Sequence, residues 1–251
     1  MADQDMNLVP YINDFANRSF RDLADQDYIA ARMCHRTELD QQFLWNSLQA
    51  IEKYLKAILL YSRKGAKGLR HDLIKALAKV QDISDIQVRL PHDVVNFIKY
   101  LNRYGPNRYL VYPTHLRDRS LLELDKSVWY VRRYCYYMRG EIRQQDGTTF
   151  SRLEGEVQKV HHPEYEGNPH KYRIFGGYLE RILDQNLPAA EHLIWKNFYF
   201  GRRRKRRIRS YRLRMSSVNP THSLRPEVFP ELDRLVDFPR EVRTHFCRGA
   251  S

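Results

Sequence analysis

Residues 43–62 constrain the fold more than any other segment, because most of their circumference is apolar. Apolar side chains recur there every three or four residues, which predicts an α-helix from about residue 39 to residue 62. A helix of this kind must be covered on most of its sides, so we expect it at the centre of a helical bundle, or between a bundle and a second subunit. Two neighbouring stripes make up its apolar surface: Leu44, Leu48, Ile51, Leu55, Ile58 and Leu59, and then Phe43, Ala50, Tyr54, Ala57 and Tyr61.

Four more helices are predicted around this central one. One spans about residues 14–35 and one starts at Asp72, a residue that favours the N-cap position. Another follows Pro91, which suits the first turn of a helix. The last begins at Ser120, which has an acidic residue three positions later as in a capping box, and runs to Gly140, a natural stop.

The second part of the chain is less regular. Asp146-Gly147-Thr148 has the composition of a turn, and residues 161–177 are rich in His, Pro, Gly and Tyr, which indicates a loop. Short helices are predicted at 178–187 and 188–203. We therefore predict an all-α protein, with a bundle of about five helices in residues 1–145. Residues 146–251 are predicted to form a basic region, mixed or irregular in structure, docked on that bundle.

Composition narrows the classes of protein that fit. A chain of 251 residues can bury a full core. No apolar run approaches 18 residues and the first residues do not resemble a secretory signal, so neither a membrane span nor export is expected. Three widely separated cysteines favour reduced thiols in the cytoplasm. The His-rich stretch 161–170 lacks the ligand spacing of zinc sites, so we expect no metal and no cofactor.

Three short strings in the first part carry a family resemblance. Gln49-Ala50-Ile51-Glu52-Lys53 is followed by Leu55-Lys56-Ala57-Ile58-Leu59, and then by His71-Asp72-Leu73. These strings resemble the core signature of the HEPN family, and the likeness covers roughly residues 14–140. The resemblance implies a small helical bundle, often dimeric, of the kind found in prokaryotic toxins, defence effectors and nucleotidyltransferase partners. The family includes both metal-independent RNases and non-catalytic members.

The resemblance also points to a candidate catalytic pair, Arg108 and His115. Catalytic members carry an Arg and a His four to six residues apart near their last helices, and six residues separate these two. Cleavage through the 2′-hydroxyl of RNA needs a group that moves a proton, as His does near neutral pH, and a cation that stabilises charge on phosphorus, as Arg does. That scheme requires no metal ion.

Other features of the sequence keep a non-catalytic interpretation open. The family pattern often continues as His-any-Tyr, whereas Leu116 and Arg117 follow His115, and Pro113 interrupts the spacer. Arg and His are abundant, and a second match occurs at Arg240–His245. The pair would then belong to a loop without catalytic function.

Two carboxylates interrupt apolar helix faces, Asp27 and Glu52. Buried carboxylates need partners, and we expect these to come from Arg103, Arg108 or Lys53. Each carboxylate is either half of a structural ion pair or a supporting residue that orients Arg108.

A basic run dominates the charge of the second part, in a chain with a formal net charge of +13. Aromatic residues bracket it, and an aromatic ring beside Arg can stack on a base while Arg holds a phosphate. The alternative is a solvated face or tail. The predicted RNA-binding residues are Arg202, Arg203, Arg204, Lys205, Arg206, Arg207 and Arg209.

Together these features predict a cytoplasmic, prokaryotic, RNA-associated protein. The sharper hypothesis is a metal-independent endoribonuclease of the toxin or defence type, controlled by a regulatory protein partner. The alternative is a non-catalytic helical protein that binds RNA or a protein partner.

The wide apolar face of residues 43–62 and the aromatic residues of 129–137 predict a two-fold homodimer, because they exceed what one bundle needs to cover. Sedimentation at micromolar concentration should give twice the monomer mass. A monomer mass at that concentration would contradict the prediction.

Overall fold

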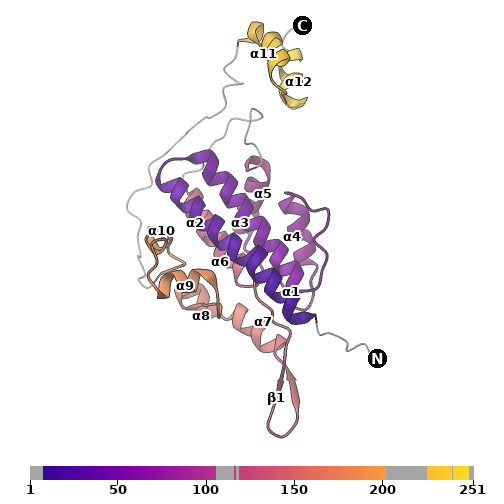
Figure 1. Ribbon diagram of the computed structural model, residues 1–251, viewed down its shortest axis with the longest axis vertical. Coiled ribbons are helices and arrows are strands. Elements are labelled where there is room, and N and C mark those ends of the chain that lie inside the picture. Colours follow the sequence, from indigo (N-terminus) through magenta and orange to yellow (C-terminus); the bar gives the residue numbers. More distant parts are fainter. Residues whose placement is uncertain (1–7, 106–115, 117–118, 202–224, 239, 249–251) are drawn as a thin grey trace.

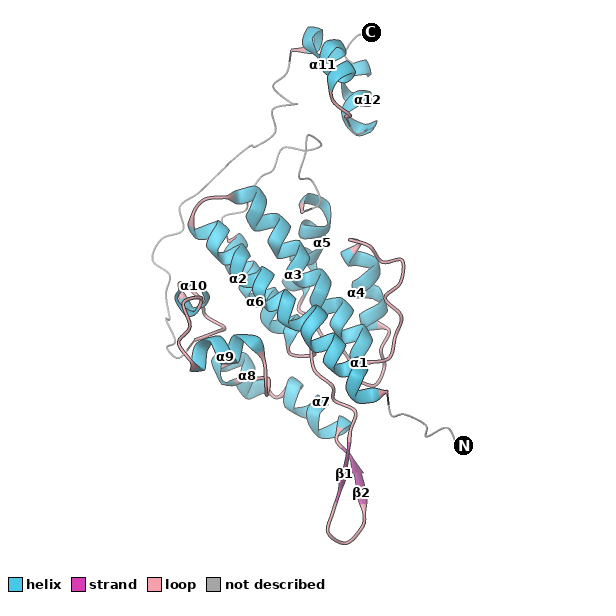
Figure 2. Ribbon diagram, in the orientation of Figure 1, coloured by secondary structure: helices cyan, strands magenta, loops and turns pink. Residues whose placement is uncertain are grey.

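The computed structural model describes residues 8–105, 116, 119–201, 225–238 and 240–248. Helices dominate these residues (Figure 2), and the only strands among them form one antiparallel pair, β1 (Glu141–Arg143) and β2 (Thr149–Ser151). The predicted all-α fold is confirmed.

The central helix is α3 (Asp40–Tyr61), as the apolar pattern predicted. It packs lengthwise against α2 (Asp22–Arg36) and also contacts α4 (Leu73–Gln81) and α5 (His92–Tyr104), with α6 (Ser120–Arg132) completing the bundle (Figure 1). Both apolar stripes of α3 are buried within a single chain. A single chain therefore already covers the apolar helix face from which the dimer was predicted. The dimer itself stays a prediction.

The first predicted helix is longer than expected and contains an irregular turn. It begins as α1 (Val9–Ala16), continues through a π-helical segment, η1 (Asn17–Arg21), and runs on into α2. Pro10 lies in the first turn, where its missing N–H does no harm. The helix therefore starts about five residues before the predicted boundary at residue 14.

The last helix of the bundle differs from its prediction at both ends. Ser120 lies inside α6 rather than capping it, and among the described residues its buried hydroxyl has no hydrogen-bond partner, so the predicted capping box is wrong. The helix stops at Arg132 and not at Gly140. Contacts from distant segments replace the helical pattern there: Tyr172 Oη donates to the Arg133 carbonyl at 2.9 Å, and Arg133 donates to the Val160 carbonyl at 2.9 Å.

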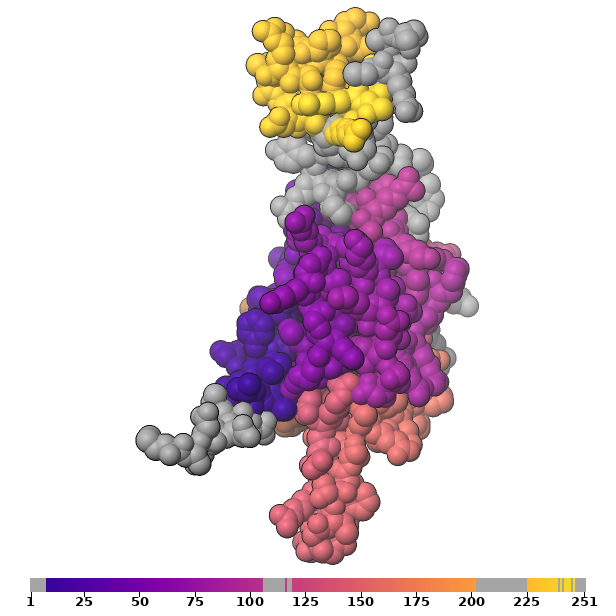
Figure 3. All heavy atoms as spheres, turned by 90° about the vertical axis from the view of Figure 1, so that its right-hand side faces the viewer, coloured from indigo at the N-terminus to yellow at the C-terminus, as the bar shows by residue number. Residues whose placement is uncertain are grey.

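The chain then forms the β1–β2 hairpin, which projects from the body of the molecule (Figure 3). Gly147 has φ 86° at its turn, a conformation that glycine adopts without strain. Five short helical segments follow along the bundle: α7 (Leu153–His161), α8 (Pro163–Gly167), η2 (Pro169–Lys171), α9 (Tyr178–Asp184) and α10 (Ala190–Ile194).

Two predictions for this region are wrong. Residues 161–177 hold α8 and η2 rather than a plain loop, and the helix predicted at 188–203 is reduced to α10. Asn197 explains the second difference, because its Oδ1 accepts from the backbone N–H groups of Tyr199 at 2.9 Å and Phe200 at 3.1 Å. This side chain supplies the turn that a continuing helix would not allow.

The last described residues form η4 (Pro226–Val228), α11 (Phe229–Leu235) and α12 (Arg240–Arg248), with a small core of their own around Phe229, Phe238 and Val242.

Two buried arginines join the bundle to the segments that follow it. Arg132 donates to both oxygens of Asp25 on α2, at 2.7 and 2.9 Å, and to both oxygens of Glu180 on α9, at 2.8 and 2.7 Å. Arg32 pairs with Asp125 on α6 and donates to the carbonyls of His192, at 2.9 Å, and Trp195. Each guanidinium therefore satisfies partners in both parts of the chain.

Glu180 should contribute strongly to stability. Burial opposes its ionisation, but Arg132 outweighs burial and holds the pKa of the Glu180 carboxyl below its usual range. Glu180→Ala leaves Arg132 buried with half of its partners, and breaking such a pair typically costs about 3 kcal/mol. We expect a drop of that order in the free energy of unfolding, measured by urea titration.

The matched control is Glu191→Ala, which removes an exposed carboxylate paired with Arg36. Its effect should be small, because solvent screens exposed pairs. Equal losses for the two variants would contradict a special role for Glu180.

Candidate functional site

The predicted catalytic pair, Arg108 and His115, lies outside the described residues, as do the RNA-binding residues 202–209. The structure does describe the points from which the segment of the pair departs. On one side α5 ends at Tyr104 and is followed by Gly105, and on the other Leu116 is buried in the main core. The groups around Gly105 and Leu116 therefore define the described surroundings of the candidate site.

Gly105 fixes how closely α5 approaches the central helix. A Cβ atom at this position would lie 2.7 Å from the Leu101 carbonyl oxygen and 2.8 Å from Leu48 Cβ on α3. Atoms cannot approach that closely, so only glycine fits. The end of α5 is thus pressed against α3 at Leu48.

Asp27, one of the two predicted supporting carboxylates, forms an ion pair with Lys53. Lys53 was one of the three partners expected for it. Burial raises the pKa of Asp27, and the hydrogen bond from Lys53 opposes that rise. The pair lies on the α2–α3 surface, where the two side chains remain only about a quarter exposed.

Glu52, the other supporting carboxylate, is buried and has two partners that were not expected. Lys56 Nζ lies 2.5 Å from Oε1, and His71 Nδ1 lies 2.8 Å from Oε2. Lys53, one of the three partners expected for it, pairs with Asp27 instead. His71 belongs to the strings that resemble the family signature, but no pattern in the sequence gave a reason to pair it with Glu52.

The backbone around His71 is held from both sides. Lys56 Nζ donates to the Arg70 carbonyl at 2.9 Å, and the Leu73 N–H donates to Asn102 Oδ1 on α5 at 2.7 Å. Asp72 caps α4, as predicted, by accepting from the N–H groups of Ile74 and Lys75. The backbone on either side of His71 is thereby held against α3 and the last turn of α5.

Residues 18–132 match the family model of the HEPN domain. The chain contains a HEPN domain. No curated protein and no solved structure matches the chain. The HEPN domain includes the Glu52–His71 pair and the stretch that carries Arg108 and His115, whereas residues 133–251 lie beyond the match.

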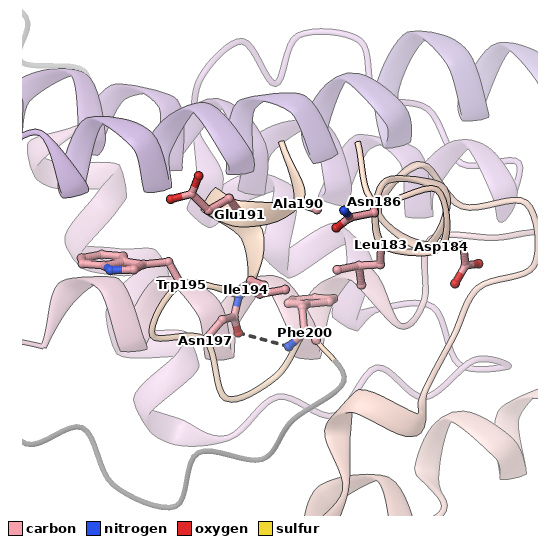
Figure 4. Close-up of a pocket in the computed structure, with 10 residues that line it drawn as sticks. Leu183, Asp184, Asn186, Ala190, Glu191, Ile194, Trp195, Asn197 and Phe200 are labelled. Atoms are coloured by element: carbon pink, nitrogen blue, oxygen red, sulfur yellow. Dashed lines mark hydrogen bonds between the residues drawn. The ribbon is translucent and has the colours of Figure 1, made fainter. Parts of the chain in front are cut away.

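Beyond the HEPN domain, a pocket of about 500 Å³ lies between α9, α10 and the turn that follows (Figure 4). Its floor is mainly apolar, with Leu183, Ile194 and Phe200 among its lining residues. Three of its polar lining residues already have partners: Asp184 pairs with Arg173 and Glu191 with Arg36, while Asn197 forms the turn described above.

None of the helices among the described residues is both long and apolar enough to cross a membrane. Within the same residues, no three His, Cys, Asp or Glu side chains come together as a metal site would need.

The arginines that hold the fold together were not predicted from the sequence. Arg32 and Arg132 lie on the buried faces of predicted helices, as do Asp25 and Asp125. A charged residue on an apolar helix face indicates a buried ion pair. From the sequence we expected such pairs only for Asp27 and Glu52. In the HEPN domain these four buried charged side chains are all used in ion pairs that hold the fold.

Proposed function

We propose that this protein binds RNA and cleaves it without a metal ion, with Arg108 and His115 as the catalytic pair. The observation that carries the proposal is the HEPN domain match at residues 18–132, which contains both residues. They belong to the connection between α5 and α6, near the last helix of the domain, where catalytic members of the family carry their Arg and His.

The chemistry follows from the two side chains. His115 gives a proton to the leaving 5′-oxygen and takes one back from water, because imidazole gains and loses a proton near neutral pH. The attacking 2′-hydroxyl loses its proton to a base. Arg108 stabilises the charge that develops on the phosphate oxygens through its planar fork of N–H groups. The products are a 2′,3′-cyclic phosphate and a 5′-hydroxyl.

Affinity for RNA is assigned to the cationic residues 202–209. Phosphate contacts supply most of the sequence-independent affinity of nucleic-acid-binding proteins, and the net charge of +13 favours a polyanionic partner. The run begins one residue after the turn at Asn197–Gly201, which is anchored to the bundle through Arg32. RNA held there would be held close to the HEPN domain.

We further propose a cytoplasmic homodimer that acts as a toxin or defence effector under a regulatory protein partner. We propose a dimer because HEPN domains are often dimeric. Uncovered apolar surface is not the reason, since α3 is covered within one chain.

A non-catalytic function is the second candidate, and one observation favours it. Leu116, which follows His115 directly, is 7% exposed and belongs to the main core. Leu116 and Arg117 stand where the catalytic pattern often continues as His-any-Tyr. On this interpretation the HEPN domain binds RNA or a protein without cleaving it.

Replacement of the catalytic pair separates these candidates. His115→Ala should abolish cleavage of RNA while RNA affinity and melting temperature stay nearly unchanged. Arg108→Lys should also lose most activity, because a point charge cannot replace the planar fork. Cleavage is followed on gels in the presence of EDTA, which should have no effect, and the 2′,3′-cyclic phosphate is identified by mass spectrometry.

His245→Ala is the matched control, since the second sequence match lies there. Cleavage that survives His115→Ala but not His245→Ala would move the site to residues 240–245. No cleavage of any RNA by the wild-type dimer would leave the binding function standing.

Binding to the cationic run should depend steeply on salt. Replacing Arg203, Arg204, Arg206 and Arg207 by Ala should flatten the plot of log affinity against log salt by roughly 0.7 to 0.9 for each phosphate group that is no longer bound. Fluorescence anisotropy with a labelled single-stranded RNA measures this slope.

The control removes the same charge elsewhere, from the exposed residues Lys64, Lys67, Arg143 and Arg225. That variant should keep the wild-type slope. If both variants change the slope equally, only the total charge matters and the run is not a specific RNA-binding segment.

A further inference from the structure

His71 is the described histidine whose surroundings most resemble an acid–base site. Its side chain is 57% exposed, while its partner Glu52 is only 7% exposed. A carboxylate can only accept hydrogen bonds, so Nδ1 of His71 donates to Glu52, and in neutral imidazole the other nitrogen, Nε2, then carries the free lone pair. A buried carboxylate that orients an exposed imidazole in this way is a common arrangement for a general base.

The geometry before His71 is strained, and the strain is held in place. Arg70 has φ 44°, in the left-handed region that residues other than glycine rarely adopt. Lys56 binds both the Arg70 carbonyl and the Glu52 carboxylate. One lysine thus fixes the strained backbone and the carboxylate that orients the ring.

Other groups hold the ring and give its surroundings a positive charge. The Trp45 ring lies 5.7 Å from the imidazole, tilted by 59°. Lys56 and the exposed Arg70 add positive charge beside His71, the sign that a phosphate group requires.

The position of this cluster matters as much as its composition. Trp45, Leu48 and Glu52 lie at helical spacing on one face of α3, and Gly105 is pressed against Leu48. Asn102, three residues before Gly105, accepts from the N–H of Leu73, two residues after His71. His71 therefore lies beside the C-terminal end of α5, within the HEPN domain.

We propose that His71 is a catalytic residue for RNA cleavage, with Glu52 and Lys56 as positioning residues. Nε2 of His71 takes the proton of the ribose 2′-hydroxyl while the 2′-oxygen attacks phosphorus. The bond from phosphorus to the 5′-oxygen breaks, and the departing oxygen is protonated as in the proposed function. His71 then returns its proton to solvent. This inference rests on the proposed endoribonuclease function.

The test measures kcat and KM for cleavage of a short RNA by the full chain and its variants. His71→Ala should lower kcat by about 100-fold or more, the usual contribution of a general base, with KM and melting temperature unchanged. His71→Asn should be equally inactive, because its amide can donate to Glu52 but cannot take a proton. Added imidazole should restore part of the activity of His71→Ala, which a purely structural role would not allow.

Glu52→Gln tests the positioning role. It should lower kcat in the wild-type background but have little further effect in His71→Ala, because residues that act as a unit are not additive. The control is His92→Ala, an exposed histidine at the opposite end of α5, which should cleave like the wild type.

Three outcomes would count against the inference. Cleavage by His71→Ala at the wild-type rate overturns it and leaves the proposed endoribonuclease standing. A loss of kcat without imidazole rescue, together with additive effects of Glu52→Gln and His71→Ala, assigns the cluster to folding. Absence of cleavage by the wild type removes the proposed function itself, and the role of His71 with it.

Discussion

The fold depends most on the guanidinium of Arg132, which is fully enclosed between Asp25 and Glu180. Burying one charge is expensive unless its hydrogen bonds are satisfied, and here two carboxylates supply four of them. One carboxylate belongs to the bundle and the other to α9. Packing of residues 146–201 against the bundle and burial of Arg132 therefore depend on each other.

Arg32 repeats this principle about two turns further along α2 from Asp25. It pairs with Asp125 on α6, and Tyr28 donates to the same carboxylate at 2.7 Å. Its remaining N–H groups reach carbonyls beside α10. Because the turn after α10 leads directly to residue 202, this arginine also fixes the position of the residues from which the cationic run continues.

The Glu52–His71 pair shows a different use of a buried carboxylate. Glu52 is buried like Asp25, but one of its partners is an imidazole that solvent reaches. A group that must exchange protons needs such exposure, whereas a group that only holds the fold does not. This contrast separates the proposed proton-transfer site from the arginine clusters, although all of them lie on the same few helices.

The sequence by itself determined the all-α class, the central helix at about 39–62, the N-cap at Asp72 and the HEPN resemblance. The first three follow from periodicity and local hydrogen bonding, which act over a few residues, and the resemblance follows from the strings at 49–59 and 71–73. The pair Asp27–Lys53 was also within reach, since a carboxylate on an apolar face needs a cation. Only the tertiary structure decided where α6 and α10 end, which charges are buried, and that His71 meets Glu52. The physical reason is distance along the chain: Arg132 meets Asp25 across 107 positions and Glu180 across 48, and no local pattern encodes such contacts.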